Sequence, residues 1–169
     1  MAKITPQIIC DIIQNGMKLD KSQIWIYNQR REIPEDIRLY VVVGLMGMKA
    51  YGNNNTVSSV DGAGMNDNLS QYMQETITID LFSYTTEAIQ RYAEVLGSLK
   101  STYSQKIQEE NALKIASIPF SMNEVSQVEG ATLLNRISIS LMVLRKYDML
   151  LSAEYIDDIE PASIDEIEL

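Results

Sequence analysis

The chain has 169 residues, of which 46% are hydrophobic and 22% charged, so it is long enough to form one domain with a sizeable core. No apolar run approaches the ~20 residues of a membrane-spanning helix, and the first residues lack the apolar stretch of a signal peptide. We therefore expect synthesis and assembly in a reducing cytoplasm. The sequence contains no histidine, which is the usual general base and the commonest metal ligand.

Negative charge is concentrated towards the C-terminal end. The whole chain carries a formal net charge of −9, but without the seven acidic residues after position 153 it has 16 acidic and 14 basic residues, a net charge of −2. These seven are Glu154, Asp157, Asp158, Glu160, Asp165, Glu166 and Glu168. Phosphate contacts need clustered lysine and arginine, so we do not expect a surface that binds duplex DNA.

The first predicted element is a helix that begins at Thr5-Pro6, with Thr5 as its cap and Pro6 at its first position. Its apolar stripe consists of Ile8, Ile9, Ile12, Ile13 and Met17. Cys10, the only cysteine, lies among these isoleucines, so we interpret it as a buried structural thiol. Residues 24–27 (IWIY) are rich in β-formers and predict a short strand.

Residues 37–48 predict a strand whose odd-numbered positions form one apolar face. The opposite face becomes apolar at Val42, Met46 and Met48, so we expect a second helical layer or a neighbouring subunit to cover it. Residues 49–67 form the longest segment without a clear pattern, and two interpretations stay open: a flexible hairpin tip, or a tongue that orders against a partner.

Residues 75–82 alternate strictly and predict a strand that pairs antiparallel with residues 37–48. A long helix then begins near Thr86 and extends to about Leu113, with Gly97-Ser98 as a point where it bends or divides. Residues 115–120 predict an edge strand, residues 121–130 a polar connection, and residues 133–147 a second clearly alternating strand.

Together these elements predict an α+β fold, an antiparallel sheet of about four strands with two helices packed on one face. Residues 1–151 would form this domain, and residues 152–169 an extended acidic arm. Such a segment is either a solvated tail or an arm whose isoleucines add to a partner's sheet edge or groove.

No catalytic, cofactor-binding or metal-binding residues are predicted, and the glycines of residues 49–67 do not form a phosphate-binding signature. We expect instead that the hairpin tip and the arm contact partners. The candidate residues are Tyr51, Asn53, Asn54, Asn55, Val60, Met65, Tyr155, Ile156, Ile159, Ile164 and Ile167.

Three phrases carry a resemblance to a known family. A strand at residues 76–82 (TITIDLF) leads directly into a helix at 87–91 (EAIQR), residues 105–111 (QKIQEEN) lead to 113–115 (LKI), and residues 134–141 read LNRISISL. In this order, over roughly residues 5–150, the chain resembles the neck or tail terminator proteins of tailed bacteriophages.

The resemblance implies a structural virion protein without enzymatic activity or cofactor. It implies a homo-oligomeric ring, usually a hexamer, that caps the tail tube and joins it to the head-tail connector or adaptor, with DNA passing through its lumen. In a contractile tail the ring would also meet the sheath. Two alternatives stay open: another ring-forming tail or connector-adaptor protein, and a small ligand-binding α+β domain.

Overall fold

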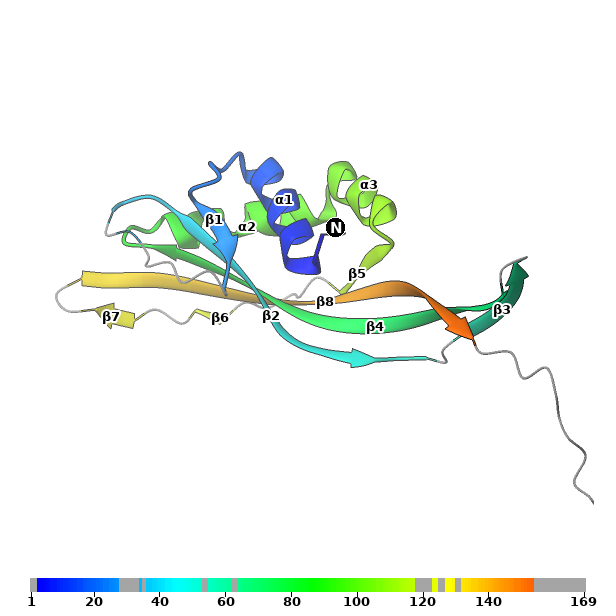
Figure 1. The fold of residues 1–169 in the computed structure, drawn as a ribbon. Helices are drawn as coiled ribbons and strands as arrows, with labels where there is room; N and C mark the ends of the chain where they lie inside the picture. The colour runs from blue at the N-terminus through cyan, green and yellow to red at the C-terminus, as the bar shows by residue number, and fades with distance from the viewer. Residues whose placement is uncertain are drawn as a thin grey trace, which may run out of the picture. The chain divides into compact units, whose positions relative to one another are not determined.

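The computed structural model describes residues 3–27, 34, 36–52, 55–61, 64–117, 123–124, 127–129 and 132–153 (Figure 1). Its elements are α1 (Thr5–Met17), β1 (Ile24–Ile26), β2 (Tyr40–Ala50), β3 (Asn55–Asp61), β4 (Gly64–Ser83), α2 (Glu87–Lys100), α3 (Thr102–Glu110), β5 (Leu113–Ser117), β6 (Asn123–Glu124), β7 (Gln127–Glu129) and β8 (Thr132–Ala153). The chain divides into two compact units, residues 1–52 with 72–146, and residues 53–71 with 147–169.

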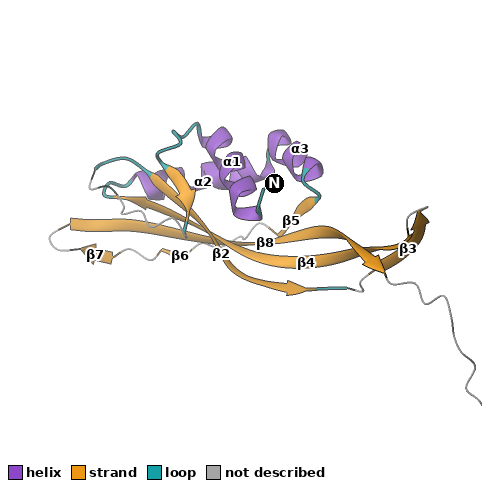
Figure 2. Ribbon diagram, in the orientation of Figure 1, coloured by secondary structure: helices purple, strands orange, loops and turns teal. Residues whose placement is uncertain are grey.

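The α+β fold class is confirmed, with the helices of the first unit on one face of its sheet (Figure 2). Five strands follow the order β1-β2-β4-β8-β5, and β3, β6 and β7 pair with β4 or β8. The predicted antiparallel pairing of β2 with β4 is also confirmed. Two details differ from the prediction: β1 lies parallel to β2, which makes the sheet mixed, and the described residues form three helices because the long helix is divided.

The core of the first unit lies between the sheet and α1 and α2. Parts of β4 and β8 alternate buried and less buried residues, whereas β2 is buried from Tyr40 to Gly44 and exposed beyond. The buried residues on the helix side include Val41, Ile79 and Ile139, each with 0% exposure. Ile9 and Ile12 of α1 are buried against them. Each such side chain contributes roughly 1.5–3 kcal/mol when it leaves water, so this layer supplies most of the stability of the unit.

Helix α1 begins one residue earlier than a Thr5 cap requires. Ile4 precedes the helix, and its N–H donates to Oε1 of Gln7 at 3.1 Å. Thr5 is helical and buried, and its Oγ1 accepts a hydrogen bond from Nη1 of Arg145 at 3.1 Å. The predicted cap was wrong because a tertiary contact from β8, which the local sequence does not reveal, uses the threonine hydroxyl.

Helices α1 and α2 approach each other closely at Gly16. A Cβ atom built on Gly16 would lie 2.0 Å from Oγ and 2.4 Å from Cβ of Ser98, so only glycine fits there. Beside this contact, Nη2 of Arg91 donates to the carbonyl of Met17 at 3.0 Å. The end of α1 is therefore fixed to α2 both by shape and by a charge-assisted hydrogen bond.

The long predicted helix divides at Ser101, three residues beyond the predicted Gly97-Ser98. Ser101 has extended φ and ψ of −66° and 157°, and its Oγ accepts from the N–H of Ser104 at 3.1 Å. Serine is a preferred N-cap residue. The break therefore lies at Ser101 because this residue caps the start of α3. Gly97 stays inside α2.

A β-bulge at Met46 changes which residues of β2 share a face. The register passes from Leu45 opposite Ile77 to Gly47 opposite Thr76, so Met46 has no direct partner and Met48 lies opposite Glu75. Residues directly opposite each other in a ladder point to the same side. Met48 therefore lies on the helix-facing side, and the prediction that it shares a face with Val42 was wrong.

Most of residues 49–67 and part of residues 121–130 are strand, which corrects two predictions of irregular chain. In the second unit, β3 pairs with the start of β4 from Asn55 opposite Ser70 to Asp61 opposite Gly64. In the first unit, β6 and β7 pair with β8. Backbone pairing with long neighbouring strands thus outweighs the glycine- and asparagine-rich composition, which disfavours strands only weakly.

Candidate interaction surface

The second half of β2 forms an exposed sheet edge. Strand β1 pairs only with Val41, Val42 and Val43, and the other side of β2 is occupied by β4. Within the described part of the chain β2 has no other strand neighbour, so the outer N–H and C=O groups of residues 45–50 have no strand partner there. Such an edge is a ready template for pairing with another chain.

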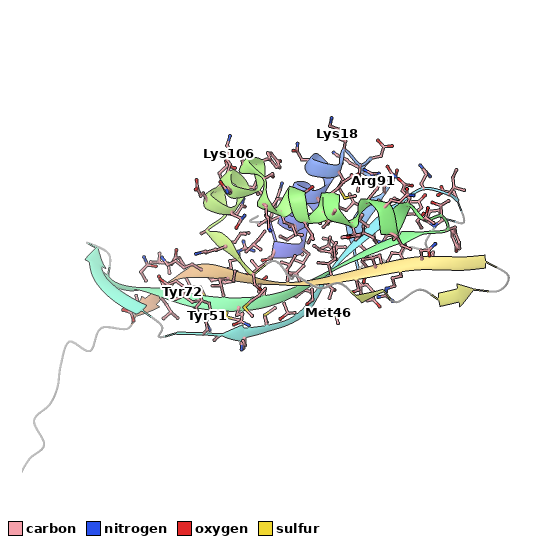
Figure 3. The ribbon with its side chains drawn as sticks, turned by 180° about the vertical axis from the view of Figure 1, so that it is seen from behind. Lys18, Met46, Tyr51, Tyr72, Arg91 and Lys106 are labelled. Carbon is pink, nitrogen blue, oxygen red and sulfur yellow. The ribbon has the colours of Figure 1, made fainter. Side chains whose placement is uncertain are left out.

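Apolar side chains are exposed along this edge. Val41 and Val43 have 0% exposure, whereas Leu45 has 40%, Met46 70% and Met48 60%. The bulge distributes these three side chains over both faces of the strand. Figure 3 shows Met46 on the strands and Lys18, Arg91 and Lys106 on the helical layer. The edge-forming residues, Leu45 to Ala50, are called the β2 edge below.

Tyr51 continues the β2 edge and packs against Tyr72 of β4. The Tyr51 N–H donates to the Tyr72 carbonyl at 3.0 Å, and the two ring centroids lie 6.0 Å apart with a tilt of 59°. Both rings line a cavity of about 260 Å³, together with Gln108, Leu113, Leu144 and Lys114 among others.

The face of the sheet away from the helices is packed at the β1 end. Trp25, Tyr40, Val42, Phe82 and Leu134 form a second buried cluster there. The rings of Trp25 and Tyr40 lie 5.5 Å apart, and the Arg136 guanidinium lies 5.2 Å from the Phe82 ring while it pairs with Asp80 at 3.1 Å. This end of the second face is thus closed without any of the described helices, whereas Met46, where a second helical layer or a neighbouring subunit was expected to cover the face, has 70% exposure.

Hydrogen bonding and burial shift the pKa values of Asp36 and Cys10. The pKa of Asp36 is lowered to about 2, chiefly by hydrogen bonds from Arg38 and Tyr40. Cys10 is half-buried, and burial raises the pKa of its thiol to about 12, so the thiol stays protonated at neutral pH. No group of three or more His, Cys, Asp or Glu residues suited to a metal ion occurs within the described ranges.

The predicted partner-contacting residues fall into three groups. Tyr51 lies in the first unit, at the end of the β2 edge, and has 36% exposure. Asn55, Val60 and Met65 belong to the β3–β4 hairpin of the second unit, where Val60 lies opposite Met65. Asn53, Asn54, Tyr155, Ile156, Ile159, Ile164 and Ile167 lie outside the described residues.

The sequence analysis did not identify the β2 edge as an edge. It identified Met46 and Met48 only as apolar positions that needed cover, because strand order and the bulge are not visible in a single strand's pattern. Gly47, next to the bulge, is the one local signal that could have suggested it.

None of the helices in the described ranges combines the length and apolar character that crossing a membrane requires. No protein-family model matches the sequence, and no curated protein matches it either, so a function has to be argued from the surfaces described above.

Proposed function

We propose that this chain is a structural virion protein that assembles with copies of itself into a ring at the end of a phage tail tube, as a tail terminator does. The observation that carries the proposal is the β2 edge, where unpaired backbone and exposed apolar side chains occur together. The resemblance of the chain to tail terminator proteins supports the same conclusion.

The β2 edge favours self-association on physical grounds. An exposed edge strand tends to pair with other chains. Proteins normally prevent this pairing with charged residues, with proline or with a covering element. Here Lys49 is the only charged residue of the edge. Burial of Met46 and Met48 in a contact gains about 25 cal/mol for each Å² of apolar surface, and added backbone hydrogen bonds fix the orientation.

A ring also needs a second, different surface on each copy. Heterologous contacts, in which one patch meets a different patch of the next copy, close into rings when the rotation allows. In the five-strand order, β5 is the terminal strand at the end of the sheet opposite β1 and β2. Strand β5 is therefore the candidate for this second surface. The proposed ring, usually of six copies, would contact the tail tube protein, the head-tail connector or adaptor and, in a contractile tail, the sheath.

The charge of the chain suits a passage for DNA as transiting cargo. With a net charge of −9 the protein repels phosphate groups overall, which limits adhesion of the moving duplex. DNA is therefore not a bound partner in this proposal.

The test is the mass of the purified protein by native mass spectrometry, together with end-on images of negatively stained particles. We expect closed rings for the natural chain and monomers for Met46→Asp. Ile89→Asp is the matched control, because Ile89 is an exposed apolar residue of α2, at 38% exposure, outside the β2 edge.

A chain that stays monomeric at high concentration would refute the proposal. Rings that stack on one another without limit would instead identify a tube protein, because a terminator stops polymerisation. Rings that bind the ends of purified tail tubes and prevent their further growth are the result we expect.

A further inference from the structure

A groove of about 310 Å³ runs where α1 meets β1, and neither the core nor the β2 edge accounts for it. Figure 1 shows the short β1 beside α1. The residues that line the groove are Gln7, Cys10, Asp11, Gln14, Lys21, Ile24, Trp25 and Ile26. Its volume lies near the lower end of the range of about 300–1,000 Å³ for binding pockets.

One wall of the groove offers backbone hydrogen-bonding groups. On the inner side of β1, the Gln23 carbonyl accepts from Val41 at 2.8 Å and the Tyr27 N–H donates to Val43 at 3.0 Å. Alternate residues of a parallel strand bond to the same neighbour, so the N–H and C=O of Ile24 and Ile26 point away from β2. Among the described strands β1 is terminal, and its outer side can receive one more strand.

The charges around the groove favour an acidic segment. Asp11, the only acidic residue among the described residues that line it, forms an ion pair with Lys3 at 2.6 Å. Lys21 therefore leaves the groove positive, and Lys18 lies in the adjoining cavity that shares Asp11 and Gln14 with it. An extended acidic chain is attracted to this rim, and its carboxylates can stay in water while an apolar side chain enters.

We propose that this groove receives residues 154–169 of a neighbouring copy, the part of the predicted arm that follows β8, as a short strand added to β1. These residues are called the arm below. The inference rests on the proposed ring, since it needs a second copy. The arm has seven acidic residues and no basic residue. Two of its triplets, Asp158-Ile159-Glu160 and Glu166-Ile167-Glu168, place one isoleucine between two acids.

The dimensions of the arm and of the groove agree. In a strand the flanking residues point away from the central one, so such a triplet places its isoleucine in the groove and both carboxylates outside, and no charge is buried. Strand β1 is 3 residues long, which matches one triplet. A stretch of 16 residues extends at most to about 55 Å, well beyond the radius of gyration of about 15 Å for a compact chain of this length.

The direct test is photo-cross-linking in the full chain. A benzoylphenylalanine replaces Ile159 in ¹⁵N-labelled protein, which is mixed with unlabelled protein, assembled, irradiated and analysed by mass spectrometry. We expect cross-links that join labelled to unlabelled copies and that lie within residues 7–26. The same cross-linker at Ile89 on α2 is the control and should not reach that segment.

The outcomes separate the two proposals. Rings without these cross-links, or cross-links confined to single copies, would overturn the docking of the arm and leave the ring intact. Monomers without cross-links would overturn both proposals.

Variants of the groove give a second measurement. Ile26→Pro removes an N–H that points outward and not towards β2, whereas Ile26→Val keeps it. We expect Ile26→Pro to lower the cross-linking yield by about fivefold, as for loss of one hydrogen bond, and Ile26→Val to leave it unchanged. If Ile26→Pro loses its fold by circular dichroism, the charge variants below decide instead.

Charge reversal tests the electrostatic part. Lys21→Glu should lower the yield to a similar extent, and the arm variant Asp158→Lys with Glu160→Lys should restore it in the Lys21→Glu background. An unchanged yield in Lys21→Glu, or no recovery in the combined variant, would show that the arm does not dock beside Lys21.

Discussion

Replacement of Gly16 by alanine should destabilise the first unit although alanine favours helices. The new Cβ would lie 2.0 Å from Oγ, 2.4 Å from Cβ and 3.1 Å from Cα of Ser98. Rotation about χ1 of Ser98 moves Oγ but leaves Cβ in place, so a rotamer change of Ser98 cannot relieve the contact at 2.4 Å. Helices α1 and α2 would have to move apart, and the apolar contacts beneath them would loosen.

The expected magnitude follows from two opposing effects. Overpacking of a closely packed contact costs about 1–3 kcal/mol, whereas glycine to alanine inside a helix gains about 1 kcal/mol. A clash this short places the cost at the upper end, so we expect Gly16→Ala to lower the free energy of unfolding by about 1–2 kcal/mol. In a protein of this size that corresponds to about 2–8 °C in Tm.

Gly97→Ala is the matched control. Gly97 also lies inside a helix, but a Cβ atom there has no neighbour within 4 Å. This variant should gain about 0.5–1 kcal/mol from helix propensity alone. Both variants are compared with the natural chain by urea denaturation followed by circular dichroism at one protein concentration, because association changes apparent stability.

A double variant completes the test. Ser98→Gly removes both side-chain atoms that Gly16→Ala would meet, so the pair should show a favourable coupling energy of about 1–2 kcal/mol. If Gly16→Ala is as stable as Gly97→Ala, the close approach of the two helices at this point is wrong.

Two further predictions concern the cap of α3 and the single thiol. Ser101→Ala removes the hydroxyl that caps the N–H of Ser104, and denaturation should show a loss of about 1 kcal/mol; equal stability would mean that the break between α2 and α3 does not depend on the cap. Cys10, with a pKa raised by burial to about 12, should react with iodoacetamide at pH 8 about a thousandfold more slowly than in the urea-unfolded chain. Because the folded pKa lies above the unfolded one, its contribution to stability is complete below pH ~9 and declines as the pH rises towards 12; equal alkylation rates in both states would contradict the burial.

The parts of the fold that the sequence predicted are those in which one element carries its own signal. Residues 76–81 and 136–141 alternate polar and apolar side chains, and both segments lie in long strands. The isoleucines of α1 recur at helical spacing, and that helix was predicted within one residue of its start. In each case the pattern reflects the burial of one face of the element against a neighbouring layer. That burial is needed whatever the order of the strands in the sheet.

The errors arose where a second element decides the conformation. Thr5 does not cap the helix, because its hydroxyl accepts a hydrogen bond from Arg145. Met48 lies on the other face of β2 because the pairing of β2 with β4 contains a bulge. Residues 55–61 form a strand because β4 continues beside them. The candidate surface was affected in the same way, since whether Met46 lies in a core or on an edge depends on where β1 ends.

The hydrogen bonds of Arg145 set an order of events during synthesis. They join Arg145 to Thr5 and to the carbonyl of Lys3, across 140 and 142 residues of chain. Strand β8, which separates β4 from β5, also belongs to the last part of the chain. Contacts so distant in sequence slow folding, so a ribosome-bound nascent chain must keep one side of β4 open until β8 has been synthesised. Rare codons before position 132 would lengthen this exposure and raise the demand for chaperones, whereas fast translation of that region would favour a good yield of the native protein.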